Sequence, residues 1–169
     1  PNDNAMEGRH LGVNSTITTG NWKDRALTLI DCGATGYAFV DFRYARQHNL
    51  PLYKLKTHRE LTVIDGRSIE SGPITHCAKF SLMIGNHREE LFAFVTALGH
   101  YPLVLGIPWL RHHDVSIQWK RNTLTFESDT CIPAHCIYAV TIHGLTTIPE
   151  PPVSISAILP AYMETLIRN

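Results

Sequence analysis

The sequence lacks an excess of charge of either sign. Its 169 residues carry 15 basic and 15 acidic side chains, so the formal net charge at neutral pH is zero. Nucleic-acid binders and membrane-surface binders concentrate Lys and Arg in patches, whereas no block of like charge occurs here. We therefore expect protein or peptide partners, and no contact of this domain with nucleic acid or membrane.

Long hydrophobic runs are also missing. No apolar segment approaches about 18 residues, the least that a membrane-spanning helix needs. The start of the chain, Pro1-Asn2-Asp3-Asn4, has neither the charged nor the apolar region of a signal peptide. We expect an intracellular, cytoplasmic location. The proline at position 1 indicates a piece cut from a longer chain.

Cysteine is scarce, and the four thiols are those of Cys32, Cys77, Cys131 and Cys136. This number is ordinary for an intracellular chain, so we expect free thiols and no disulfides. A zinc site is conceivable in one place, but the spacing there matches no common ligand pattern: Cys131, His135, Cys136 and His143. The ten histidines contain no HExxH pair and are expected at the surface or in helix caps. We predict no metal and no cofactor.

What is present is a series of short apolar or alternating runs separated by turn residues, which predicts an all-β domain. The predicted strands are Ala26–Ile30, Glu60–Ile64, Ser68–Ser71, Ile74–Ile84, Glu89–Val95, Leu103–Leu105, Ser116–Trp119 and Thr123–Phe126. Helical spacing and prolines predict two short helices, over Ala38–His48 and Pro108–His113. Hairpin turns are expected at Asp65-Gly66 and at Gly85-Asn86.

These patterns divide the chain into three parts. Residues 1–20 are polar and without sustained period, which predicts a flexible N-terminal segment. Residues 21–128 form the predicted domain, with enough apolar material for one core. Residues 129–169 are rich in Pro, Ser and Thr and are predicted to be an extended linker.

The tetrapeptide Asp31-Cys32-Gly33-Ala34, followed by Thr35, is the most informative motif. It ends the apolar run Ala26–Ile30. Burial of a polar group without a hydrogen bond costs about 2–7 kcal/mol, so an unpaired aspartate beside this run would cost several kcal/mol. Gly33 permits a sharp turn and close backbone approach, and Ala34 leaves room for a substrate backbone. The alternative is an Asx-type turn residue that merely closes a strand.

Three features in order resemble the retropepsins, the aspartic proteases of retroviruses and retrotransposons. They are the Asp31–Thr35 turn, the Asp65-Gly66 hairpin and the Leu103-Val104-Leu105-Gly106 segment that leads into a helix. The Val104–Leu110 block and the closing Thr123–Phe126 strand make the resemblance closest to Ty3/Gypsy elements. It covers about residues 22 to 128 and implies a small closed β-barrel that acts as a homodimer.

The resemblance implies a role for each part of the motif. Asp31 would be catalytic in an active-site loop with Cys32, Gly33, Ala34 and Thr35. The flap that binds substrate would contain Ile64, Asp65 and Gly66, and the supporting loop Leu105 and Gly106. The substrate would be the element's own polyprotein, inside a retroelement particle, and the tail would lead toward a reverse transcriptase.

Aspartic-protease chemistry needs two carboxylates that share a proton, and only one such motif occurs here. Asp41, Asp65 and Asp114 lack the Gly-Ala sequel. We therefore expect a symmetric homodimer in which each subunit supplies one Asp31.

Cys32 departs from the family pattern, which has Ser or Thr at this position. A thiol is a poorer hydrogen-bond donor than a hydroxyl, so we expect weaker dimer stabilisation and lower activity. Two other readings stay open. The domain could be a catalytically impaired or domesticated dimerisation and peptide-binding module. It could also be an unrelated β-barrel, which would be favoured if residues 100–126 did not pack beside Asp31.

Overall fold

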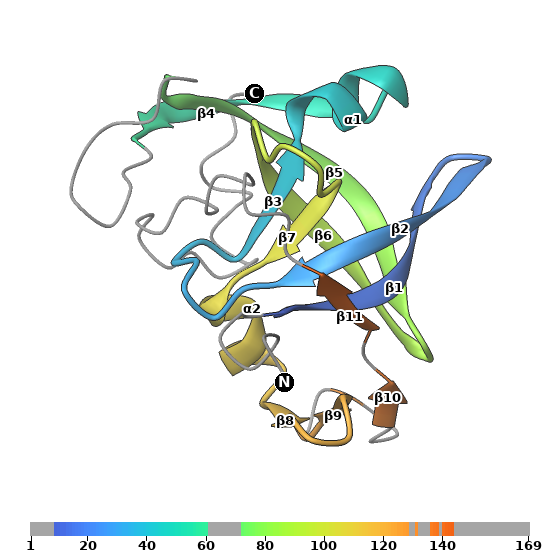
Figure 1. Cartoon of the computed structure of the whole chain (residues 1–169). Coiled ribbons are helices and arrows are strands. Elements are labelled where there is room, and N and C mark those ends of the chain that lie inside the picture. Colours follow the sequence, from blue (N-terminus) through green and yellow to red (C-terminus); the bar gives the residue numbers. More distant parts are fainter. Residues whose placement is uncertain (1–8, 61–71, 129–130, 132–135, 139, 144–169) are drawn as a thin grey trace.

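The computed structural model of the chain describes residues 9–60, 72–128, 131, 136–138 and 140–143, and these form one β-barrel with a small sheet at one end (Figure 1). The larger sheet has eight strands in the order β11-β1-β2-β7-β3-β6-β5-β4. Their bounds are β1 (Arg9–Thr19), β2 (Trp22–Ile30), β3 (Ala38–Asp41), β4 (Leu52–Arg59), β5 (Ile74–Ile84), β6 (His87–Thr96), β7 (Leu103–Leu105) and β11 (Val140–His143).

A further pairing between β1 and β5 closes this sheet on itself. It joins Thr16, Ile17 and Thr18 to Met83, Leu82 and Ser81, so that β1, β2, β7, β3, β6 and β5 form a ring. Closure pairs every strand of the ring on both sides, while β4 and β11 lie outside the ring as edge strands. The predicted small closed all-β barrel is confirmed.

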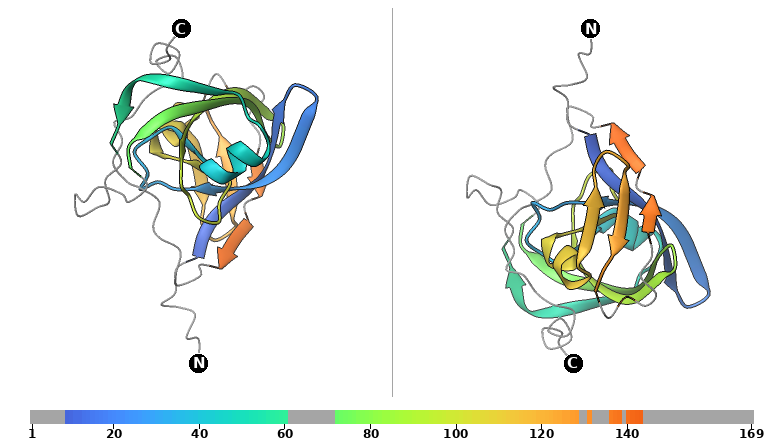
Figure 2. Two further views of the ribbon diagram at one scale, coloured as in Figure 1. Left: turned by 90° about the horizontal axis from the view of Figure 1, so that it is seen from above. Right: turned by 90° about the horizontal axis from the view of Figure 1, so that it is seen from below.

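The second sheet lies across one end of the barrel, as the view from below in Figure 2 shows. It has three strands in the order β10-β9-β8, with bounds β8 (Val115–Gln118), β9 (Thr123–Phe126) and β10 (Cys136–Tyr138). Two short helices complete the described fold: α1 (Phe42–Gln47) and α2 (Ile107–His112). Each has six residues, and no helix in the described part of the chain has the length and apolarity to cross a membrane.

Alternating burial explains why the longest strands form where they do. In β5, Phe80, Leu82 and Ile84 are buried while Ser81 and Met83 between them are partly exposed. The strand turns into β6 through the predicted two-residue Gly85-Asn86 turn, where Gly85 has a φ of 57° and Ile84 pairs with His87. A left-handed backbone of this kind favours glycine, so the local sequence sets the register of this hairpin.

The prediction of a flexible segment over residues 1–20 is wrong for the described residues from 9 onward, which form β1. Leu11, Val13 and Ile17 alternate into the core, and this period of two was present in the sequence. It was obscured by Ser15, which is buried at a core position because its hydroxyl bonds to Ala26 O (3.0 Å) and Thr28 Oγ1 (2.6 Å). A polar residue satisfied by hydrogen bonds can occupy a core position at little cost.

The prediction that the folded domain ends near Ser128 is also wrong. β10 pairs with β9, and β11 pairs with the start of β1, so residues beyond 128 belong to the sheets. These strands are short, three and four residues, and they complete edges that other strands present. β11 pairs with a strand more than a hundred positions away, and β10 has only three residues, so local patterns did not reveal them.

The helix predicted over Ala38–His48 begins only at Phe42. Residues 38–41 form β3, buried on all four residues because it lies between β6 and β7. A short apolar run of this kind has no periodicity to separate strand from helix. Asp41 then caps α1, with Oδ2 accepting from Arg43 N (3.0 Å) and Tyr44 N (3.1 Å).

β4 was not predicted because almost none of its residues is apolar and buried. Only Leu55 is buried, so this edge strand lacks an apolar alternation. The helix predicted over Pro108–His113 is confirmed as α2, shifted by one residue. The predicted strands Glu60–Ile64 and Ser68–Ser71, with the Asp65-Gly66 turn between them, lie in or against residues 61–71, outside the described residues.

Candidate active site

The site is built where β7 passes between β2 and β3. β7 pairs in parallel with β2, so that Leu105 lies opposite Ile30, and antiparallel with β3, so that Leu105 also lies opposite Ala38. Asp31 continues the first ladder, with its N–H donating to Leu105 O over 2.9 Å. The aspartate is therefore fixed at the end of a strand paired on both sides.

Asp31 opens the loop of residues 31–37, which folds back on it. The backbone N–H of Gly33 donates to Asp31 Oδ1 (2.9 Å), and that of Ala34 donates to Asp31 O (3.1 Å). Asp31 is half-buried, Cys32 and Gly33 are exposed, and Ala34 is buried. The loop thus presents the carboxyl group at the surface while Ala34 anchors it to the core.

The loop is locked against the segment that follows β7. Ile107 N donates to Ala34 O (2.8 Å), and Gly106 N donates to Tyr37 O (3.0 Å). A Cβ atom on Gly106 would lie 1.9 Å from Gly36 O, so only glycine allows this crossing. Its φ is −96°, which shows that close backbone approach, and not a left-handed turn, requires glycine here.

The structure brings together the predicted loop, Asp31 to Thr35, and the predicted supporting residues Leu105 and Gly106. Within residues 100–126, Leu105 bonds to Asp31 and Ile107 bonds to Ala34, which contradicts the reading of an unrelated barrel. The predicted flap residues Ile64, Asp65 and Gly66 lie outside the described residues. Two of the aspartates without the Gly-Ala sequel are placed: Asp41 caps α1 and Asp114 is exposed after α2.

A buried polar network beneath α2 supports the loop, and the sequence analysis missed it. Its centre is Glu89 of β6. Glu89 Oε1 accepts from Trp109 Nε1 (2.5 Å), and Oε2 accepts from Tyr37 Oη (3.1 Å) and lies 3.0 Å from His113 Nε2. Because Tyr37 ends the Asp31 loop and Trp109 lies in α2, Glu89 ties both to the barrel wall. The alternation of β6 gave no sign that a carboxylate would point inward.

The network holds Glu89 in its charged form. Burial would raise the pKa of this carboxyl group, but hydrogen bonds from His113, His87 and Trp109 and the charge of His113 lower it to about 2. The pKa of the Tyr37 hydroxyl is raised by burial and by the adjacent Glu89 charge. The Tyr37 hydroxyl is therefore protonated at neutral pH and donates to Glu89.

We expect Glu89 to make the fold sensitive to acid. A carboxyl pKa of about 2, against its ordinary 4.5, corresponds to about 3 kcal/mol of folding free energy. This contribution is complete above pH 4.5 and is lost as the pH falls toward 2. Chemical denaturation across this pH range should show the loss in the parent chain and a flatter profile in Glu89→Gln. The exposed neighbour is the control: Glu90→Gln should keep the parent profile, and equal slopes in both variants would contradict the assignment.

The arrangement can be compared with known proteins. The family model of the PEG10/RTL1 protease domain matches residues 27–136, which include the Asp31 loop, β7, α2, β8 and β9. The chain belongs to this family of protease domains. The predicted likeness to retropepsin-like domains is thereby confirmed.

The PEG10/RTL1 protease domain of this chain also has a similar solved structure. The retroviral protease-like domain of Ddi1 from Leishmania major matches with a TM-score of 0.50 and 18% sequence identity. The match covers 83% of this chain and 98% of the other. At this identity the likeness concerns the fold alone, and it supports the retropepsin-like barrel.

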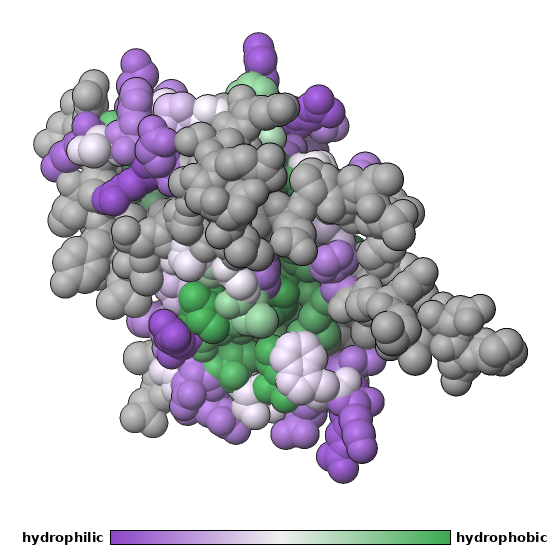
Figure 3. All heavy atoms as spheres, turned by 60° about the vertical axis from the view of Figure 1, so that its left-hand side comes forward, coloured by the Kyte–Doolittle hydropathy of each residue, from purple (hydrophilic) through white to green (hydrophobic). Residues whose placement is uncertain are grey.

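An apolar area lies on the side of the protease domain where α2 and β8 are found in Figure 1. Figure 3 shows it in the lower half of that face, with hydrophilic side chains along its lower border. These elements carry partly buried apolar residues, Ile107, Val115 and Ile117, and Trp119 after β8 is 64% exposed. Bordered apolar areas of this kind are typical of protein interaction surfaces.

Proposed function

We propose that this domain is the aspartic endopeptidase of a retrotransposon polyprotein, active as a homodimer in which each subunit supplies Asp31. The observation that carries the proposal is the crossing of the Asp31 loop with Leu105 and Gly106, which holds one carboxyl group at the surface. Retropepsin-like folds generally dimerise and bind peptides, and the apolar area beside α2 offers a surface for a second copy.

The chemistry follows from two carboxyl groups that share one proton. The charged carboxylate removes a proton from a water molecule, whose oxygen attacks the carbonyl carbon of the scissile peptide bond. The protonated carboxyl group donates its proton to the carbonyl oxygen. Breakdown of the tetrahedral intermediate then transfers a proton to the leaving amine. The pair titrates as a unit, so activity is expected to be highest in mild acid.

The substrate is proposed to be the element's own polyprotein, bound as an extended strand through main-chain hydrogen bonds and apolar pockets. Cleavage of an unfolded polypeptide by the purified chain, followed by mass spectrometry, tests this function. We expect activity in mild acid, inhibition by a statine-type compound and a rate that rises with the square of concentration below the dimer dissociation constant. Efficient cleavage by a monomer would contradict the proposal.

A second candidate function is a dimerisation and peptide-binding module with little or no hydrolysis. Cys32 favours it, because this exposed side chain stands where the family has the hydroxyl of Ser or Thr. In the family that hydroxyl donates a hydrogen bond to the loop of the opposite subunit. A thiol is a weaker donor and a larger atom, so the two loops would be held less firmly.

Cys32→Ser is therefore expected to tighten the dimer. Each of the two loops regains one hydrogen bond of about 1 kcal/mol, so the dimer gains about 2 kcal/mol, which corresponds to a dissociation constant about 30-fold lower. Sedimentation equilibrium measures this change directly. Cys32→Ala is the matched control, because it removes the thiol without supplying a hydroxyl. An equal affinity of the serine and alanine variants would show that the hydroxyl has no such role.

A further inference from the structure

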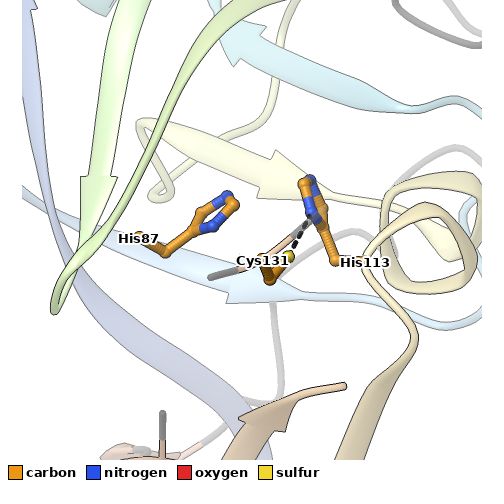
Figure 4. A group of neighbouring side chains, drawn as sticks. All are labelled: His87, His113 and Cys131. Carbon is orange, nitrogen blue, oxygen red and sulfur yellow. Dashed lines mark hydrogen bonds between the residues drawn. The ribbon is translucent and has the colours of Figure 1, made fainter. Parts of the chain in front are cut away.

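Three side chains of metal-binding type meet in the core beneath α2. His87 begins β6, His113 follows α2, and Cys131 lies beyond β9, so they come from three separate segments. All three are buried, and one possible ligand atom from each lies within 4.8 Å of the others. Figure 4 shows the side chains directed toward one another, with His113 and Cys131 in contact.

The orientation of His113 is suited to a metal ligand. Its Nε2 lies 3.0 Å from Glu89 Oε2, and its Nδ1 lies 3.3 Å from Cys131 Sγ. When Nε2–H donates to the carboxylate, the lone pair of Nδ1 faces the sulfur. Histidines that bind metals almost always donate their other N–H to a carboxylate or carbonyl in this way.

The charge of the cluster also favours a cation. Glu89 is 13% exposed and its Oε2 lies 3.0 Å from His113 Nε2, so a cation bound beside His113 would be attracted to a mostly buried carboxyl group. A divalent ion that displaces the thiol proton of Cys131 would leave one thiolate and one carboxylate beside two positive charges. The buried charges then sum to zero.

We propose that His87, His113 and Cys131 bind a zinc ion, with Glu89 as the residue that positions His113. Imidazole nitrogen and thiolate sulfur together suit Zn²⁺, whereas oxygen ligands suit Mg²⁺ and Ca²⁺. Bonds of about 2.0–2.3 Å place the ligand atoms of a tetrahedral ion about 3.3–3.8 Å apart. The His113–Cys131 pair already meets this spacing at 3.3 Å, and a ligand atom of His87 lies within 4.8 Å of both, so binding requires His87 to move closer by up to about 1 Å. Binding releases the thiol proton to solvent.

Zinc at this site would fasten the C-terminal part of the domain to the barrel. Cys131 precedes β10 and β11, which pair with β9 and β1 at sheet edges. An ion that joins residue 131 to β6 and α2 holds this part in place, and binding free energy adds to folding free energy. This role is structural and does not depend on the proposed protease activity.

The experiment titrates the metal-free full chain with Zn²⁺ by calorimetry and with Co²⁺ by absorption spectroscopy. We expect one ion per chain, a thiolate-to-Co²⁺ band with the visible spectrum of a tetrahedral site, and a higher melting temperature with Zn²⁺ but not with Mg²⁺. A parent chain that gives no thiolate-to-Co²⁺ band overturns the proposal, and this readout does not depend on the folding of any variant.

Substitutions test which side chains bind the zinc ion. Cys131→Ser should weaken Zn²⁺ binding by at least about 100-fold, and Glu89→Gln by about 10–100-fold through the loss of His113 orientation. The matched control changes the other thiols: a chain with Cys32→Ser, Cys77→Ala and Cys136→Ser keeps Cys131 and should keep the Co²⁺ band. Loss of the band in this control, or unchanged affinity in Cys131→Ser, would overturn the assignment.

Discussion

Asp31→Asn is expected to abolish peptide cleavage while the fold remains intact. The asparagine keeps a side-chain oxygen that can accept the N–H of Gly33, as Asp31 Oδ1 does over 2.9 Å. It cannot take or give the proton that the proposed mechanism moves. Because proton transfer by a positioned side chain contributes about 10²–10⁴-fold, kcat should fall by at least about 1,000-fold.

The measurement is the initial rate of cleavage at the acidic optimum, with the melting temperature as a check on folding. Asp114→Asn is the matched control. Asp114 is exposed and has a φ of 45°, a conformation that asparagine tolerates, so the same chemical change should leave both activity and stability unaltered. If Asp31→Asn retained activity within about tenfold of the parent, a general acid–base role for Asp31 would be untenable.

Gly106→Ala is expected to destabilise the domain more than Gly20→Ala, which also adds a single methyl group. The added Cβ would lie 1.9 Å from Gly36 O and 2.8 Å from Ala34 O, and both are backbone atoms that cannot rotate away. Relief requires the Asp31 loop to separate from β7, which breaks the hydrogen bonds from Gly106 N and Ile107 N. Overpacking of a core together with these losses should cost about 3 kcal/mol or more.

Chemical denaturation measures this change in the free energy of unfolding. Gly20→Ala is the control, because a Cβ at this position has no neighbour within 4 Å, although its φ of 55° strains any side chain. That strain alone should cost about 1–2 kcal/mol. A Gly106→Ala variant no less stable than Gly20→Ala would show that the close crossing of the two loops is not rigid.

The sequence predicted the strands whose signals are local. β5, β7 and β9 have the predicted bounds, since their alternation or flanking glycines are visible within a few residues. The Gly85-Asn86 turn followed from the conformational freedom of glycine. The buried thiol of Cys77 and the core position of Trp109, each 0% exposed, also followed from their apolar surroundings.

Two of the elements that were missed depend on distant partners. β11 is held by pairing with the start of β1, more than a hundred positions away, and β3 is a strand because β6 and β7 lie on either side of it. No local pattern carries such information. A satisfied buried polar residue, Ser15 in β1, further hid the period of two that burial imposes.

The sequence by itself determined where the aspartate lies, after a buried strand and in a glycine turn, and its single motif led us to predict a second copy. Tertiary structure decided why Gly106 must be glycine and where the histidines lie. His113 was expected at the surface or in a helix cap; it does cap α2, but it is buried beside Glu89, His87 and Cys131. A turn motif depends on adjacent residues, so it can be read from the sequence. Charge compensation and close packing depend on residues from separate strands, so only the folded structure shows them.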